Sequence, residues 1–216
     1  LEHYASVEEV GRREYLESPD NHSRARSFAN KQRKAGELSL LVGRYDEADR
    51  KLHEAEDILV SLRAEHEEDL RWLLSIARAQ VAVGRLALER DDITLATSRA
   101  EAAHALVLEL LAGSPDNSEN QRVLMTALLL RGDVAARSGD PASATQFWEE
   151  LVADMAPQVE NSRDPEWLEA YVAALARLDR MMDAERYLQR LRDMDYRRPG
   201  PMLALMRGEE MRPATD

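Results

Sequence analysis

Glycine recurs in this chain at a fixed interval of 48 residues. Gly36, Gly84 and Gly132 hold one register. Three alanines hold a second register with the same spacing: Ala48, Ala96 and Ala144. The tetrapeptide Ser-Pro-Asp-Asn at residues 18–21 also returns two periods later, at residues 114–117. A fixed period of this length indicates an array of structural repeats, in which each repeat buries its apolar face against the next one.

The recurring glycines lie within segments whose apolar residues are three and four positions apart, which is the spacing of an α-helix. A glycine inside a helix costs about 1 kcal/mol relative to alanine. Because three such glycines occur in one register, another interaction must offset the free energy that they cost the helices. We predict that Gly36, Gly84 and Gly132 each allow a neighbouring helix to approach so closely that a side chain would block it.

Each repeat is predicted to contain two helices joined by a tight turn, and the fourth pair is shorter than the others. A Gly or Asp break followed by a helix-capping residue marks each turn, and Asp140-Pro141 places a cap before proline at the first helical position. The predicted first helices are residues 21–42, 68–89, 117–138 and 165–178. The predicted second helices are residues 46–64, 93–112, 142–158 and 182–194.

The two ends of the chain differ from the array, which we place at residues 18–195. Residues 1–17 are predicted to be an orphan second helix of a preceding repeat, because Tyr4, Val7 and Val10 lie one period before apolar residues of the 46–64 helix. The uncovered apolar edge of this helix would permit a homodimer. Residues 196–216 are predicted to be a capping segment, with a short apolar stretch at residues 202–206, and a frayed tail.

Composition supports an all-α fold and excludes several functions. Nine Gly and eight Pro are too few for the many turns of an all-β fold. The formal net charge of −12 disfavours nucleic acid and anionic lipid as partners, because both require clustered positive charge. No apolar run reaches the roughly 20 residues that span a bilayer, so we expect no membrane segment. The absence of cysteine leaves the compartment open, with the cytoplasm favoured.

Residues that could carry chemistry show no catalytic or metal-binding pattern. The five histidines lack metal-ligand spacing, and the chain contains no nucleophile motif and no phosphate-binding glycine loop. We therefore predict no enzyme activity, no metal and no cofactor. Trp72, Trp148 and Trp167 lie beside apolar residues at helical spacing and are predicted to be core residues. The methionines near the C-terminal end, Met182 among them, are predicted to pack beneath the capping segment, with an adaptable binding surface as the alternative.

The recurring small residues resemble the tetratricopeptide pattern, in which a small residue midway along the first helix faces an alanine in the second. The resemblance covers about residues 20–195 and implies a right-handed α-solenoid of antiparallel helix pairs. Two departures are clear: the usual unit has about 34 residues, and the early aromatic position reads Gln32, Gln80 and Leu128. Long units of this kind are similar to arrays in large bacterial signalling and effector proteins, and the ending at residues 196–205 is similar to array ends in bacterial serine/threonine kinases.

The resemblance also implies which positions line the concave groove, where peptides commonly bind in such arrays. These positions, with three more on the same helix faces, are Arg26, Asn30, Arg33, Glu37, Arg78, Arg85, Arg122, Asp133 and Arg137. Several arginines in one groove would suit an acidic segment, because a guanidinium pairs bidentately with a carboxylate. The alternative is that these arginines pair with Glu37, Glu89 and Asp133 and only solvate the surface.

The functional hypothesis that follows is a protein-binding or peptide-binding scaffold within a larger bacterial signalling or effector protein. A ligand-sensing domain coupled to an output domain such as a kinase is the alternative, and a structural spacer is a third. The charge pattern is compatible with each of them. Residues 21–36 carry five basic and no acidic residues, whereas residues 46–69 hold ten acidic and three basic ones. A partner could recognise this polarity, but mutual neutralisation of neighbouring helices is the preferred interpretation.

Overall fold

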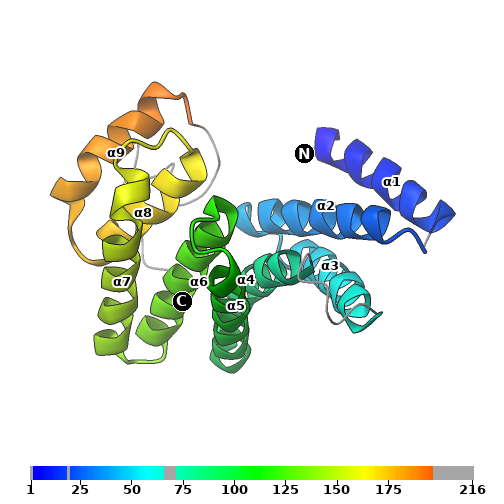
Figure 1. Cartoon of the computed structure of the whole chain (residues 1–216), viewed down its shortest axis with the longest axis horizontal. Coiled ribbons are helices and arrows are strands. Elements are labelled where there is room, and N and C mark those ends of the chain that lie inside the picture. The colour runs from blue at the N-terminus through cyan, green and yellow to red at the C-terminus, as the bar shows by residue number, and fades with distance from the viewer. Residues whose placement is uncertain (1, 19, 66–71, 197–216) are drawn as a thin grey trace. The chain divides into compact units, whose positions relative to one another are not determined.

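The computed structural model describes residues 2–18, 20–65 and 72–196. Within these ranges the chain forms nine α-helices and no strand (Figure 1). The predicted all-α fold class is therefore confirmed. The helices are α1 (Glu2–Glu17), α2 (His22–Leu41), α3 (Tyr45–Glu65), α4 (Leu73–Glu89), α5 (Ile93–Gly113), α6 (Ser118–Arg137), α7 (Pro141–Val159), α8 (Pro165–Arg177) and α9 (Met181–Asp193).

The predicted helix boundaries agree closely with those observed. Every predicted end that falls within the described residues lies within one residue of the observed end; the helix predicted at residues 93–112, for example, is α5. The start predicted at residue 68 lies outside the described residues. So do the capping segment and frayed tail beyond residue 196, including the apolar stretch at residues 202–206.

Side-chain caps and prolines explain where several helices begin. Oδ1 of Asn21, Asp92 and Asp140 accepts a hydrogen bond from the amide three residues later, at 3.1, 2.9 and 3.1 Å. Pro141 and Pro165 occupy the start of α7 and α8, where the missing amide hydrogen costs no intrahelical bond. These local bonds satisfy amides that would otherwise lack a partner at the helix end.

A left-handed residue follows the end of five helices, and three of these residues keep the 48-residue period. Gly43 and Gly139 have φ of 75° and 84°, and Asp91 lies at the same register between them with φ of 61°. Asp179 and Asp195 follow α8 and α9 in the same way, with φ of 57° and 52°. In all five turns the next amide donates to the carbonyl five positions earlier, at 2.8 to 3.1 Å. The turns are thus one repeated geometry, and aspartate tolerates it where glycine is absent.

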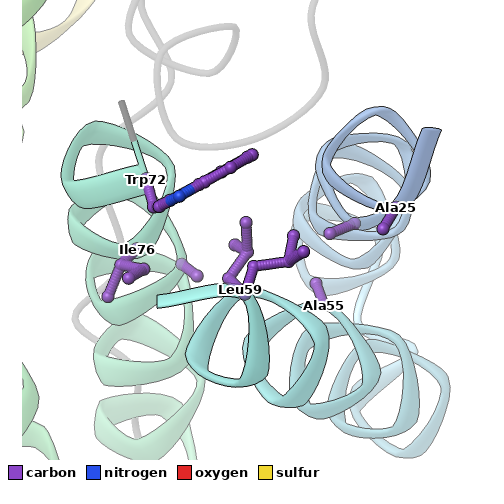
Figure 2. Packing of buried hydrophobic residues seen from close by; sticks show 8 residues of the cluster. Ala25, Ala55, Leu59, Trp72 and Ile76 are labelled. Carbon is purple, nitrogen blue, oxygen red and sulfur yellow. The ribbon is translucent and has the colours of Figure 1, made fainter. Parts of the chain in front are cut away.

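The chain divides into two compact units, Leu1–Leu130 and Arg131–Asp216. In the first unit, α2, α3 and α4 enclose a buried cluster to which each contributes small or branched apolar side chains. Figure 2 shows Leu59 of α3 directed into the space between Ala25 of α2 and Trp72 at the start of α4. Leu59 is completely buried, and Trp72 is 4% exposed. Burial of this kind stabilises the unit by about 25 cal/mol for each Å² of apolar surface removed from water.

The second unit buries apolar residues of α7, α8 and α9, among them Leu151, Leu168 and Leu188. Trp148 and Trp167 are also buried, as is Trp72 in the first unit, which confirms the prediction that all three tryptophans are core residues. The prediction for Met182 was wrong, because this side chain is 92% exposed. Met182 lies in the first turn of α9, on the side opposite the buried residues of that helix.

The predicted close approach at the glycines is confirmed. A Cβ added to Gly36 would lie 2.7 Å from Leu52 Cγ and 3.3 Å from the Ala48 carbonyl oxygen. A Cβ added to Gly132 would overlap Trp148 Nε1 and lie 2.5 Å from Trp148 Cδ1. Leu52 and Trp148 hold the same register of the repeat. In both helix pairs, therefore, the glycine makes room for one large residue of the second helix.

Gly84 also lies where a side chain would collide with a neighbouring helix, but its neighbours differ from those of Gly36 and Gly132. The residue at the register of Leu52 is here Ala100, which is too small to fill the space. A Cβ added to Gly84 would instead lie 2.7 Å from Leu130 Cδ2 and 3.2 Å from Arg99 Cβ. All three glycines are thus blocked by a side chain of another helix, although the blocking side chain differs.

Candidate partner-binding face

The nine predicted groove residues lie on three helices. The first unit contains seven of them: four on α2, two on α4 and one on the first part of α6. The second unit contains Asp133 and Arg137, on the last part of α6. The two sets are described separately below. Contacts between helices decide which of these side chains can bind a partner.

Two of the predicted residues on α2 bridge to α4. The Arg26 guanidinium lies over the Trp72 ring, 5.6 Å from its centroid. Asn30 Nδ2 donates a hydrogen bond to Ser75 Oγ at 3.3 Å. A cation above an indole is worth about 0.5–1 kcal/mol at a partly exposed site. Arg26 and Asn30 therefore help to hold the two helices together.

Arg33 and Glu37 form an ion pair within α2. Arg33 Nη1 donates to Glu37 Oε1 at 2.6 Å, and Arg33 is only 7% exposed. A guanidinium this buried needs a carboxylate, since an unpaired buried charge is strongly unfavourable. The predicted alternative of pairing among these residues therefore describes Arg33 and Glu37 correctly.

Arg78 and Arg122 share one carboxylate. Arg78 Nη2 of α4 donates to Glu119 Oε2, and Arg122 Nη1 donates to Glu119 Oε1 at 2.9 Å. Burial raises the pKa of Glu119, but the hydrogen bond and charge of Arg78, followed by those of Arg122, outweigh burial and hold the pKa below its ordinary value. The cluster connects α4 with α6 and keeps two positive charges beside one negative charge.

Replacing Arg78 by glutamine is expected to raise the pKa of Glu119. The substitution removes the charge and the hydrogen bond of Arg78, which are the largest contributions that lower this pKa. Carboxyl resonances followed by NMR during a pH titration would measure the change. The pKa of Glu47 serves as the internal control, because it is lowered by Lys51 and Arg44 and should not move. An unchanged Glu119 titration would contradict the contact.

Arg85 differs from the other arginines of the first unit. It lies on α4 and is partly buried, yet it forms no hydrogen bond or ion pair with any residue that the structure describes. The nearest acidic residue along α4 is Glu89, at the exposed C-terminal end of the helix, which accepts a hydrogen bond from Tyr45 at 3.5 Å. The Arg85 guanidinium therefore retains its full capacity to bind a carboxylate from outside these residues.

In the second unit, Asp133 is held by a residue that the sequence analysis did not select. Arg177 of α8 donates to both oxygens of Asp133, with Nη2 2.7 Å from Oδ2. Arg177 lies three periods after Arg33, so the 48-residue register contained a signal for it. Arg137 is exposed in the last turn of α6. Asp133 thus connects two helices, in the same manner as Glu119 in the first unit.

Two acidic residues of α3 form hydrogen bonds or ion pairs with side chains of neighbouring helices. Glu56, which is 6% exposed, accepts a hydrogen bond from Gln80 Nε2 of α4 at 2.7 Å and forms an ion pair with Arg99 Nη1 of α5 at 2.6 Å. Glu54 accepts from Arg12 of α1 at 2.7 Å and also from Gln32 of α2. Gln32 and Gln80 thus each donate a hydrogen bond to a glutamate of α3.

The described residues contain no group of three or more His, Asp or Glu side chains that could hold a metal ion. Among the described helices, none is long and apolar enough to cross a bilayer. The geometry so far consists of close-packed helix pairs, arginine–carboxylate contacts between helices, and the partly buried Arg85, for which the described residues supply no ion pair. Comparison with protein-family models, curated proteins and solved structures finds no match to this chain.

Proposed function

We propose that this chain is a protein-interaction module whose helix pairs stack as a right-handed solenoid of the tetratricopeptide kind. In this proposal it belongs to a larger bacterial signalling or effector protein and binds an acidic segment of a partner on the face formed by α2, α4 and the first part of α6. The observation that carries the proposal is the partly buried Arg85, which has no counter-charge among the described residues.

The charge of the helices supports an acidic partner. Helix α2 carries five basic residues and one acidic residue, and α4 carries two basic residues and one acidic residue. Helix α3 carries seven acidic and three basic residues, but two of its carboxylates, Glu54 and Glu56, already bind residues of α1, α4 and α5. The face that includes Arg78, Arg85 and Arg122 therefore keeps an excess of positive charge, although the whole chain is acidic.

Arg85 would be the anchor of this face. A hydrogen bond to a charged group contributes about 1.5–3 kcal/mol, and a guanidinium can make two such bonds to one carboxylate. Arg78 and Arg122, which both bind Glu119, would add a longer-range attraction. Arg33 would contribute less, since Glu37 already neutralises it inside the protein.

Replacing Arg85 by glutamate is expected to weaken binding of a glutamate-rich peptide by about tenfold or more, which corresponds to the loss of one charge-assisted bond and the addition of a repulsion. Fluorescence anisotropy with a labelled peptide would measure the dissociation constant. Arg50→Glu is the matched control, because Arg50 lies exposed on α3 and also lacks an ion pair among the described residues. Equal weakening by both variants would show that only net charge matters and would exclude this face.

A further inference from the structure

Helix α1 packs along α2 and buries little of its own side-chain surface (Figure 1). Among residues 9–17, whose side chains the structure describes, only Gly11 is buried, and Val10 and Leu16 are 44% and 66% exposed. Gly11 lies one period before Leu59, which is completely buried between α2 and α4. Helix α1 thus lacks the large side chain that anchors α3, and segments with few buried apolar contacts open most readily.

The surface of α2 beneath α1 is matched to this glycine. Lys31 of α2 lies one period before Ala79 of α4, which belongs to the buried cluster around Leu59. A Cβ added to Gly11 would lie 3.0 Å from Lys31 Cδ and 3.1 Å from Lys31 Nζ. The Lys31 side chain therefore covers the point where a side chain of α1 would begin, and its Nζ lies 3.9 Å from Glu14 Oε2. A helix that binds here needs a small residue at this position.

Arg12 and Tyr15 of α1 add three directional contacts. The Tyr15 ring stacks on the Phe28 ring of α2, with the centroids 5.3 Å apart. The Arg12 guanidinium lies 5.3 Å from the centroid of the same ring, and its Nη2 donates to Glu54 Oε2 of α3 at 2.7 Å. Phe28 is 1% exposed with α1 in place. Removal of α1 would therefore expose this ring and leave one carboxylate and one ammonium group without their α1 partners.

These contacts are specific, but each of them is weak. The four side chains of the Arg12–Glu54 and Lys31–Glu14 pairs are between 27% and 52% exposed. Ion pairs that remain this accessible to water contribute little to stability. Helix α1 can therefore leave its place while α2, α3 and α4 stay packed around Leu59.

We propose that the surface beneath α1 is a helix-binding site, which a partner protein occupies by displacing α1. The partner helix would carry the pattern Gly-Arg-x-Glu-Tyr, which α1 presents at residues 11–15. Its glycine would admit Lys31, its glutamate would pair with the Lys31 ammonium group, and its arginine would bind Glu54 above Phe28. Its tyrosine would stack on Phe28.

A second copy of this chain is a poorer occupant than a separate partner. Exchange of α1 between two copies would recreate the same contacts and would add the free-energy cost of association. The site is formed by Phe28, Lys31 and Glu54, whereas the proposed acidic-segment function depends on Arg85. The two proposals can therefore fail independently.

The test uses the whole chain with Gly11→Pro, which breaks α1 in its middle and leaves every residue of α2 and α3 unchanged. The probe is a labelled peptide of residues 2–17 with the natural sequence, acetylated and amidated. We expect saturable binding by fluorescence anisotropy and a shift of the Phe28 ring signals in NMR. The ring of Phe147, the other phenylalanine of the chain, lies on α7 and should not respond.

The natural chain is the first control, because its own α1 occupies the site. The short turn at residues 18–21 tethers α1 to α2, which gives α1 an effective concentration of about 1 mM. The natural chain is therefore expected to bind the peptide at least about tenfold more weakly than the Gly11→Pro chain. Equal binding by the two chains would place the peptide elsewhere and overturn the proposal.

Variants of the peptide test the recognition pattern. Arg12→Gln, Tyr15→Ala and Gly11→Leu are each expected to weaken binding to the Gly11→Pro chain by about tenfold, because they remove the ion pair, the ring stack or the room for Lys31. Arg13→Gln is the matched control, since Arg13 is exposed and forms no hydrogen bond or ion pair with any residue that the structure describes. An alanine-rich helix that carries only Gly-Arg-Ala-Glu-Tyr should also bind.

Three further results would overturn the proposal. The first is no saturable binding of the natural peptide by the Gly11→Pro chain. The second is equal weakening by Arg12→Gln and Arg13→Gln, which would show that only charge matters. The third is a dimer of the natural chain in light scattering at high concentration that Gly11→Pro abolishes, because this result would assign the site to a second copy.

Discussion

Replacing Leu59 by alanine is expected to destabilise the first unit by about 2–5 kcal/mol, the usual cost of such a truncation in a packed core. Leu59 is completely buried between α2 and α4, so its removal leaves a cavity that three helices border. Urea unfolding followed by far-ultraviolet circular dichroism would measure the loss. Amide hydrogen exchange in α2, α3 and α4 would locate it in the first unit.

The next residue in the chain provides the control. Val60 belongs to the same helix but is 49% exposed. Val60→Ala removes surface that is largely in contact with water, so its effect is expected to stay within about 0.5 kcal/mol. If Leu59→Ala had no larger effect than Val60→Ala, the packing of α2, α3 and α4 around Leu59 would be wrong.

Replacing Gly132 by alanine is expected to destabilise the second unit by about 1–2 kcal/mol. Alanine would gain about 1 kcal/mol of helix propensity, but inserting a methyl group into a packed site costs about 1–3 kcal/mol. We expect the upper part of that range here, because the added Cβ meets the rigid indole of Trp148, which is 9% exposed. Chemical unfolding followed by tryptophan fluorescence would measure the net change in the free energy of unfolding.

Gly113 is the matched control, because a side chain at this position would meet no neighbouring atom. It is the last residue of α5, it is exposed, and a Cβ added to it would meet nothing within 4 Å. Gly113→Ala should therefore leave stability unchanged or raise it by up to about 1 kcal/mol. A loss of stability at both glycines would mean that packing does not distinguish them.

The helices of this chain could be predicted from sequence because local chemistry sets their ends. Asp92 caps the amide of Leu95 within α5, and Gly139 adopts the left-handed conformation that ends α6. Neither feature depends on the rest of the fold. The close packing at Gly132 could also be predicted, since a glycine inside a helix carries a cost that only tertiary contact offsets.

The contacts of the arginines could not be predicted in the same way. Arg78 and Glu119 are 41 residues apart and belong to different helices, so their pairing depends on how α4 and α6 are placed. A helical pattern shows only that each residue is polar and on an outer face. For the same reason the sequence did not distinguish Arg33, which is buried and paired, from Arg85, which has no described partner.

A cavity of about 300 Å³ lies between α8 and α9, and its position could not be predicted from the sequence either. Its residues are spread from Tyr171 to Tyr187 across two helices and a turn. Each of them looks ordinary alone: the tyrosines resemble core residues, and the arginines resemble surface residues. Only the packing of two short helices brings these side chains around one hollow.

The most direct test of the repeated close packing is a double-mutant cycle between Gly132 and Trp148. Trp148→Ala places at this register the residue found at Ala100 in the preceding repeat, and it removes the indole that blocks a side chain at Gly132. In that background Gly132→Ala should raise the free energy of unfolding, whereas in the natural chain it should lower it. The same loss in both backgrounds would contradict the explanation of why glycine recurs every 48 residues.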